Sequence, residues 1–246
     1  MTEITQQWYA SWFDSPFYHI LYKDRDYNEA EAFMYNLTNY LNIPEQGEIL
    51  DLACGKGRHA VTLNSSGHRV LGVDLSAQSI AAAKGFENSN LSFAVHDMRK
   101  AIQGETFDCV FNLFTSFGYF DSHEENERVC EAIYKMLKPG GQLVIDFMNA
   151  TKVINNIVEK EQKSLNGIDF NISRKYTGTH ILKEIRFVDK GEHYHFTERV
   201  QTIDREQFVK LLAPYFNIKF TFGSFDLDEY IPEKSERLII IASRKL

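Results

Sequence analysis

The chain has 246 residues, enough for one large domain or two small ones. Hydrophobic residues make up 43% of it and charged residues 25%, an ordinary globular composition that excludes a disordered chain. Its 34 acidic residues outnumber its 27 basic ones, for a net charge of -7. This balance disfavours a nucleic-acid partner, so we expect a small-molecule partner instead.

The cysteines and the N-terminal sequence predict a cytoplasmic protein. Cys54, Cys109 and Cys130 show no CxxC spacing, so neither a disulfide framework nor a zinc site is indicated. The first residues do not follow a signal-peptide pattern, and no apolar stretch is long enough for a bilayer. We therefore expect no membrane partner.

Strand and helix patterns alternate from residue 48 onward, which predicts βαβ units and a parallel sheet. The predicted strands are 48–54, 68–74, 91–96, 107–113 and, after a turn at 138–141, 142–148. The predicted helices are 57–66, 77–84 and a helix running to Leu137. Ser76 is expected to cap the second helix, and Ser122 with Glu125 the third.

A different pattern follows. From about 163 to 203, three strand patterns at 169–176, 180–188 and 192–203 succeed one another without helices, which predicts an antiparallel insertion. Gly178 and Lys190-Gly191 mark its turns. Asp204 and Gln207 then predict a helix to Leu212, followed by strands near 216–225 and 237–243. The chain is interpreted as one α/β, Rossmann-like domain that carries an antiparallel β insertion.

The segment before residue 48 is rich in aromatic residues and precedes a helix that should begin near Tyr27. The rings are expected to pack as a helical layer on the sheet, to cover a pocket, or to do both. They are Trp8, Tyr9, Trp12, Phe13, Phe17, Tyr18, Tyr22 and Tyr27.

The loop ACGKGRHA, residues 53–60, follows the first strand and opens a helix. Gly55 and Gly57 permit a tight turn and a close approach of ligand to backbone. The pattern Gly55-x-Gly57-x-x-Ala60 also fits a dinucleotide site, and Asp74 ends the second strand where a ribose-binding acid is expected. The glycines alone leave the cofactor open.

Five motifs extend this pattern in order and spacing. They are DLACGKG (51–57), VLGVDLS (70–76), HDMR (96–99), FDCVFNLFTSFGYF (107–120) and LKPGGQLVIDF (137–147). With them the chain resembles the class I S-adenosylmethionine-dependent methyltransferases of small-molecule type. The resemblance implies a seven-stranded, mostly parallel sheet with helices on both faces. We predict one methyltransferase domain over 1–246, comprising a helical cap (1–45), a cofactor-binding core (46–150), the β insertion (163–203) and the completion of the sheet (204–246).

The resemblance implies S-adenosylmethionine as cofactor and gives three carboxylates a role. Asp51 would meet the methionine ammonium, Asp74 the ribose hydroxyls and Asp97 the adenine amino group. A turn carboxylate is the alternative for Asp97. The other cofactor-binding residues that the resemblance implies are Ala53, Cys54, Gly55 and Gly57 through their backbone, Leu75 and Met98 on the ring faces, and Asn112 or Leu113 beside the sulfonium. The thiol of Cys54 is interpreted as packing, not as a nucleophile.

Three residues are candidates for catalysis. Tyr18 and Tyr22 are expected to wall the transferring methyl group, because an N-terminal aromatic segment closes over the cofactor in related methyltransferases. His123 ranks first as a base if the acceptor must lose a proton. His193 and His195 share one strand face, but no third ligand is evident, so no metal site is predicted.

The function predicted is methyl transfer to a nitrogen or oxygen of a small molecule. The alternatives are an NAD-dependent oxidoreductase and a non-catalytic S-adenosylmethionine-binding protein. The insertion loosely resembles that of small-molecule N-methyltransferases, including those acting on amino sugars. Its polar residues recognise the substrate, form the interface of a homodimer, or simply face the solvent.

Overall fold

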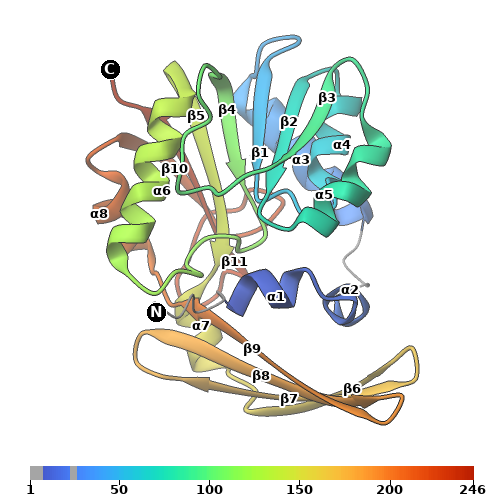
Figure 1. Ribbon diagram of the computed structural model, residues 1–246. Coiled ribbons are helices and arrows are strands. Elements are labelled where there is room, and N and C mark those ends of the chain that lie inside the picture. Colours follow the sequence, from blue (N-terminus) through green and yellow to red (C-terminus); the bar gives the residue numbers. More distant parts are fainter. Residues whose placement is uncertain (1–7, 23–26) are drawn as a thin grey trace, which may run out of the picture. The chain divides into compact units, whose positions relative to one another are not determined.

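Figure 1 shows the computed structural model, which describes residues 8–22 and 27–246. The chain divides into two compact units, Met1–Arg25 with Val153–Thr202 and Asp26–Lys152 with Ile203–Leu246. Each unit therefore draws on two separate stretches of sequence. The interpretation of residues 1–246 as a single domain stays a prediction.

The larger unit contains a seven-stranded sheet in the order β10-β11-β5-β4-β1-β2-β3. Neighbouring strands from β5 to β3 run parallel, whereas β11 is antiparallel to both β5 and β10. The strands are β1 Glu48–Leu52, β2 Arg69–Asp74, β3 Leu91–Val95, β4 Phe107–Asn112, β5 Leu137–Met148, β10 Phe216–Phe222 and β11 Arg237–Arg244. The predicted Rossmann-like sheet is confirmed.

Helices cover both faces of this sheet (Figure 1). They are α3 Tyr27–Leu41, α4 Arg58–Ser65, α5 Ala77–Ala83 with the 3-10 turn η1 Lys84–Phe86, α6 His123–Met136 and α8 Arg205–Leu212. On one face, Phe33 of α3, Leu63 of α4 and Ile80 of α5 share a core with Phe111 and Val144 of the strands. On the other, α6 packs against α8 and β5, and α8 against β10.

The predicted helix starts are present because their caps form. Ser76 accepts a hydrogen bond from a backbone N–H in the first turn of α5 (3.0 Å), and Ser122 accepts one from Glu125 (3.3 Å). At α8, Asp204 and Gln207 each accept the backbone N–H of the other at 2.8 Å. These bonds satisfy donors that a helix start leaves unpaired.

The start of β5 corrects one prediction. The sequence predicts a turn at 138–141, but these residues belong to β5, which begins at Leu137 beside Phe107 of β4. The register of the two strands shifts between Phe107 and Cys109, and Gly140 has a φ of 77°. Proline and glycine therefore mark an irregularity within the strand and not its beginning.

The smaller unit is a four-stranded antiparallel sheet in the order β6-β7-β8-β9, packed against two short helices. Its elements are α1 Trp8–Phe13, α2 Pro16–Leu21, β6 Lys160–Leu165, β7 Ile168–Tyr176, β8 His180–Asp189 and β9 Glu192–Gln201. Trp12 and Leu21 of the helices share a core with Phe170, Ile185 and Phe187 of the sheet. The N-terminal rings thus form a helical layer, and the sheet beneath it is the inserted one.

Two elements here are not predicted by the sequence. The helix α7, Ala150–Asn155, precedes the insertion, and the inserted sheet begins with β6 at Lys160 instead of near 163. β6 has the polar sequence KEQKSL and is mostly exposed, so it lacks the apolar alternation that predicts a strand. β6 is a strand because it pairs with β7.

None of the helices within 8–22 and 27–246 is long and apolar enough to cross a membrane.

Candidate functional site

The loop between β1 and α4 is folded tightly against β2. The backbone N–H groups of Ala53 and Cys54 both donate to the carbonyl of Val73, at 2.8 and 2.9 Å. Ala53, Gly55 and Gly57 have φ values of 67°, 57° and 83°, in the region that glycine adopts most easily. The loop therefore lies at the carboxyl ends of parallel strands, where such sheets bind ligands.

The two glycines serve different purposes. A Cβ atom at Gly57 would lie 2.6 Å from the ring of Phe93, so this position requires glycine for packing as well as for backbone conformation. A Cβ atom at Gly55 would meet no described atom within 4 Å. The open side of the loop is therefore at Gly55, where a ligand can approach the backbone.

Asp74 ties this loop to the start of α5. Its Oδ2 accepts the backbone N–H of Gly55 and its Oδ1 that of Ser76, both at 2.8 Å. A carboxylate accepts several hydrogen bonds at once, so the same group can hold the loop and accept ribose hydroxyls. The ribose role stays a prediction.

Asp51 is a buried carboxyl group at the end of β1. Its side chain is 1% exposed, and its Oδ2 has no hydrogen-bond partner among the described residues. Burial, reinforced by the charge of Asp74, raises the pKa of Asp51 to about 7, against the opposing effects of the Ala60 backbone and Arg58. An orphaned buried oxygen is costly, and a cationic hydrogen-bond donor would satisfy it.

Asn112 provides a second buried acceptor, on the neighbouring strand. Its Nδ2 donates to the carbonyl of Leu52 at 3.0 Å, whereas its Oδ1 is buried without a partner in the part of the chain that the structure describes. Because Asp51 pairs with Phe111 in the parallel sheet, Asp51 and Asn112 both lie at the carboxyl ends of the adjacent strands β1 and β4, with their side chains on opposite faces. This edge therefore presents two oxygens suited to a ligand's polar groups.

Cys54 is a buried, free thiol in this loop. Burial, with the charges of Asp51 and Asp74, raises the pKa of its thiol far above the usual range. A nucleophilic cysteine needs a depressed pKa, so the interpretation of this side chain as packing agrees with its surroundings.

Asp97 lies in an ionic cluster after β3. Arg99 donates to both of its carboxylate oxygens, at 2.7 to 3.1 Å, and a second branch of Arg99 reaches Glu125 at 2.6 Å. Burial acts to raise the pKa of Asp97, but the hydrogen bonds and charge of Arg99 outweigh it and lower the pKa. The backbone of Arg99 also donates to Asp97, as the turn alternative expects, and the adenine role stays a prediction.

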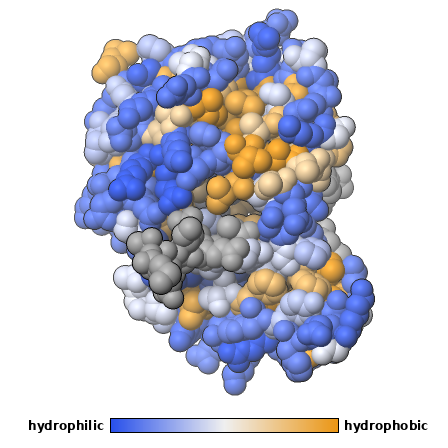
Figure 2. All heavy atoms as spheres, viewed as in Figure 1, coloured by the Kyte–Doolittle hydropathy of each residue, from blue (hydrophilic) through white to orange (hydrophobic). Residues whose placement is uncertain are grey.

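The remaining cofactor candidates differ in exposure. Leu75 is 41% exposed and Met98 is half-buried, so both keep apolar surface for a planar ring. Leu113 is buried in the core beneath the sheet edge. Figure 2 shows hydrophobic side chains reaching the surface on one face of the larger unit.

His123 is the first residue of α6. Its side chain is 65% exposed, and its Nε2 lies 3.6 Å from Glu127 Oε1 one turn further along the helix. This is a pairing on an exposed helix face, and the role of His123 as a base stays a prediction.

Tyr18 and Tyr22 belong to the smaller unit. The hydroxyl of Tyr22 donates to Glu198 at 2.6 Å, and Lys183 donates to Tyr22. The ring of Tyr18 packs edge-on against Trp12. Both tyrosines are therefore built into the layer on the inserted sheet, and their role toward the methyl group stays a prediction.

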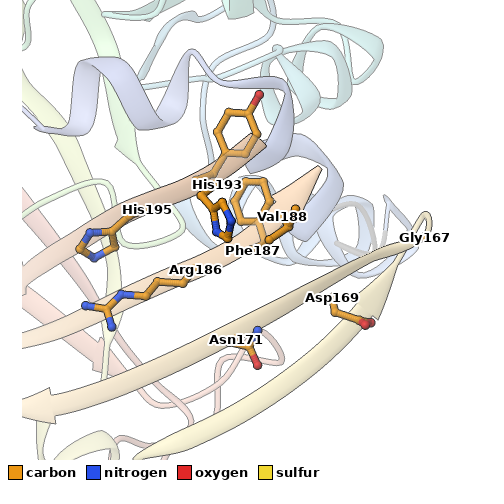
Figure 3. Close-up of a pocket in the computed structure, with 9 residues that line it drawn as sticks. Gly167, Asp169, Asn171, Arg186, Phe187, Val188, His193 and His195 are labelled. Atoms are coloured by element: carbon orange, nitrogen blue, oxygen red, sulfur yellow. The ribbon is translucent and has the colours of Figure 1, made fainter. Parts of the chain in front are cut away.

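The outer face of the inserted sheet carries a hollow of about 540 Å³. In Figure 3, Arg186 from β8 and His193 and His195 from β9 extend on this face, with Asp169 and Asn171 on β7. His195 lies 3.7 Å from Glu184. No group of three or more potential metal ligands is present in the residues that the structure describes.

Sequence reasoning missed a buried ion pair at the edge of the main sheet. Asp146, on β5, is fully buried and accepts the Nε of Arg237 at 2.7 Å. It also accepts the backbone N–H of Phe114, in the turn after β4, at 2.9 Å. The partners lie 91 positions apart in the chain, and only the position of Asp146 at a strand's carboxyl end could have marked it.

Comparison with known sequences finds methyltransferases. Residues 49–141 match the family described as "Methyltransferase domain". The putative methyltransferase YqeM of Bacillus subtilis (strain 168) is 33% identical over 116 residues, 46% of this chain and 47% of that protein, so the chain matches about half of its length. A putative methyltransferase of Geobacillus sp. (strain WCH70) is 25% identical over 98% of this chain and 100% of its own. A glycine/sarcosine N-methyltransferase of Aphanothece halophytica is 28% identical over 68% of this chain and 60% of its own.

Solved structures share the whole fold. An S-adenosylmethionine-dependent methyltransferase from Clostridium acetobutylicum ATCC 824 aligns with a TM-score of 0.77 at 18% identity, over 92% of this chain and 94% of its own. The S-adenosylmethionine-bound amino pentose methyltransferase from Micromonospora echinaspora aligns with a TM-score of 0.72 at 19% identity, over 94% and 98%. Residues 49–141 therefore match a methyltransferase domain, and the strand order and the solved structures show that the chain has the fold of class I S-adenosylmethionine-dependent methyltransferases.

Proposed function

We propose that this methyltransferase transfers the methyl group of S-adenosylmethionine to a nitrogen atom of a small molecule. The observation that carries the proposal is the buried Oδ2 of Asp51, which has no partner within the described chain and lies beside the glycine loop. The names of two similar proteins, a glycine/sarcosine N-methyltransferase and an amino pentose methyltransferase, support a small amine as acceptor.

The residues of this edge fit the cofactor part by part. Asp51 would accept the methionine ammonium, Asp74 the ribose hydroxyls and Asp97 the adenine amino group. Asn112, with its unpartnered Oδ1, would lie on the sulfonium side. The backbone of Ala53, Cys54, Gly55 and Gly57 would line the methionyl and ribose parts, Leu75 and Met98 the ring faces, and Leu113 the core side of the sulfonium.

When bound, S-adenosylmethionine would supply an electrophilic methyl group to the lone pair of the acceptor nitrogen, and its sulfur would retain the electron pair of the carbon–sulfur bond. The chain would orient the donor. Asp51 and Asp74 would hold two distant parts of it, so that its methyl group points toward the acceptor. Apolar residues at the edge exclude competing water. His123 or water would accept the proton that the nitrogen loses.

The cofactor assignment is tested with two matched aspartates. Asp74→Ala should raise the dissociation constant for S-adenosylhomocysteine at least about tenfold, because hydrogen bonds to a charged group are lost. Asp108→Ala is the control, since Asp108 also accepts a backbone N–H (Glu48, 2.8 Å) but lies at the opposite end of β4. Calorimetry showing equal affinity for both variants would refute the ribose role.

The acceptor class is tested by methyl transfer from labelled S-adenosylmethionine to paired compounds. Glycine, sarcosine and an amino sugar should become labelled, whereas analogues with a hydroxyl in place of the amine should not. Labelling of the hydroxyl analogues alone would replace the nitrogen acceptor with an oxygen acceptor.

A further inference from the structure

The turn that follows β4 has a strained backbone. Phe114 and Thr115 have φ values of 56° and 60°, where a bulky or β-branched residue is an outlier. Such conformations persist only where surrounding groups hold them, and they cluster at functional sites. One residue, Leu113, separates this turn from Asn112, whose Oδ1 is buried without a partner in the described chain. The groups that hold the turn therefore also fix a candidate ligand-binding residue.

Two residues hold it. Asp146 accepts the backbone N–H of Phe114 with its Oδ2 and that of Thr115 with its main-chain carbonyl, both at 2.9 Å. Arg237 donates from Nε to Asp146 Oδ1 at 2.7 Å and from Nη2 to Thr115 Oγ1 at 3.1 Å. One guanidinium thus bridges the carboxylate and the turn, which the single ammonium of a lysine is poorly shaped to do.

The turn is also joined to the glycine loop. The guanidinium carbon of Arg58 lies 4.4 Å from the centre of the Phe114 ring, and the ring centre of His59 lies 5.0 Å from it. Arg58 and His59 begin α4, directly after Gly57. A displaced Phe114 would therefore disturb both the end of β4 and the start of α4.

We infer that Arg237 is a positioning residue for the methyl donor. Through Asp146 it fixes the turn, and through the turn it fixes Asn112 and the helix that follows the glycine loop. The inference rests on the proposed function, because it assumes that the donor binds between these two segments.

The test compares two arginines of β11. The guanidinium of Arg244 likewise makes a hydrogen bond, here to the main-chain carbonyl of Leu137 at 2.5 Å, and lies 4.5 Å from the centre of the Tyr134 ring, but at the other end of the strand. Arg237→Met should raise the calorimetric dissociation constant for S-adenosylhomocysteine about tenfold, and Arg244→Met by less than about twofold. Thermal unfolding should show lower stability in both. Arg237→Lys keeps a charge beside Asp146, so it provides a folded variant, with an intermediate affinity, if the methionine variant does not fold.

A rescue separates positioning from stability. Glycine adopts a left-handed φ without strain. The double variant with Thr115→Gly and Arg237→Met should therefore bind S-adenosylhomocysteine with a dissociation constant at least about twofold lower than that of Arg237→Met alone. Unchanged binding in Arg237→Met and Arg237→Lys, an equal loss in Arg244→Met, or no rescue would each overturn the inference. Failure of the unmodified protein to bind S-adenosylhomocysteine would instead overturn the proposed function, and the inference with it.

Discussion

At the scale of single residues, the carboxyl ends of β1 and β4 contain buried polar groups that lower stability. Asp51 is buried with one oxygen unpartnered in the described chain, and Asn112, on the neighbouring strand, also has a buried, unpartnered oxygen. Each such group costs free energy in the empty protein. Both residues are predicted as cofactor-binding residues through the resemblance that the motifs at 51–57 and 107–120 carry. The sequence does not predict Arg237, because its bond to Asp146 spans 91 positions and no local pattern marks either partner.

The raised pKa of Asp51 predicts a pH-dependent stability. Its pKa of about 7 in the folded chain exceeds the value near 4 expected when unfolded. Between these values the folded protein holds a proton that the unfolded chain has lost, so unfolding releases it and stability falls as pH rises. Asp51→Asn should therefore gain stability relative to the unmodified protein from about pH 5 to about pH 8, by up to about 1.4 kcal/mol per unit of pKa difference.

Urea unfolding without cofactor at both pH values measures this difference. A gap between the two proteins that stays constant with pH would show that the Asp51 carboxyl titrates alike in the folded and unfolded chain.

At the scale of elements, a helix or strand can be predicted from the sequence when neighbouring residues determine it, and not when its pairing with another strand does. The strands β1 to β4 and the caps of α5 and α8 are encoded within a few residues, so sequence patterns locate them. β6 has no apolar alternation and exists through its pairing with β7. The residues 138–141 read as a turn because proline and glycine usually end strands. The pairing of Leu137 and Gln142 with β4, on either side of them, includes them in β5 as an irregularity.

The glycine loop allows a comparison within one element. Gly57→Ala and Gly55→Ala both place a side chain at positive φ, which costs about 1–2 kcal/mol. Only at Gly57 would the new Cβ lie 2.6 Å from Phe93, and such overpacking costs about 1–3 kcal/mol more. Thermal unfolding of the cofactor-free protein should therefore show a larger loss of stability for Gly57→Ala than for Gly55→Ala. Equal losses would mean that the Phe93 ring moves aside without an energetic cost.

At the scale of the whole molecule, each unit is assembled from two distant stretches of sequence. In the smaller unit, Trp12 donates its indole N–H to Glu198 at 2.7 Å, and Tyr22 donates to the same carboxylate at 2.6 Å. Lys183 lies 3.4 Å from Glu198, with only 12% of its side chain exposed. Burial lowers the pKa of Lys183 although the charge of Glu198 opposes it. A polar network and an apolar core therefore join the N-terminal helices to the sheet.

A chain that begins at Asp26 tests this dependence. It would lack α1 and α2 and expose the sheet residues that they bury, among them Phe170 and Phe187. We expect this chain to bind a hydrophobic dye and to aggregate, because exposed apolar patches of this kind associate. An unchanged unfolding midpoint with no dye binding would mean that the sheet is stable without its helical layer.

The place of β11 has a consequence for synthesis. Strand β11, Arg237–Arg244, lies between β5 and β10 in the interior of the sheet. It follows all the other strands of this sheet in the sequence, so the ribosome makes it last. Until it emerges, β10 has no partner in the sheet and β5 presents an unpaired edge that includes Val144, Ile145 and Phe147. An unpaired apolar edge is a template for aggregation. We therefore expect a nascent chain arrested before residue 237 to bind chaperones, because the sheet of the larger unit is complete only once this strand has been made.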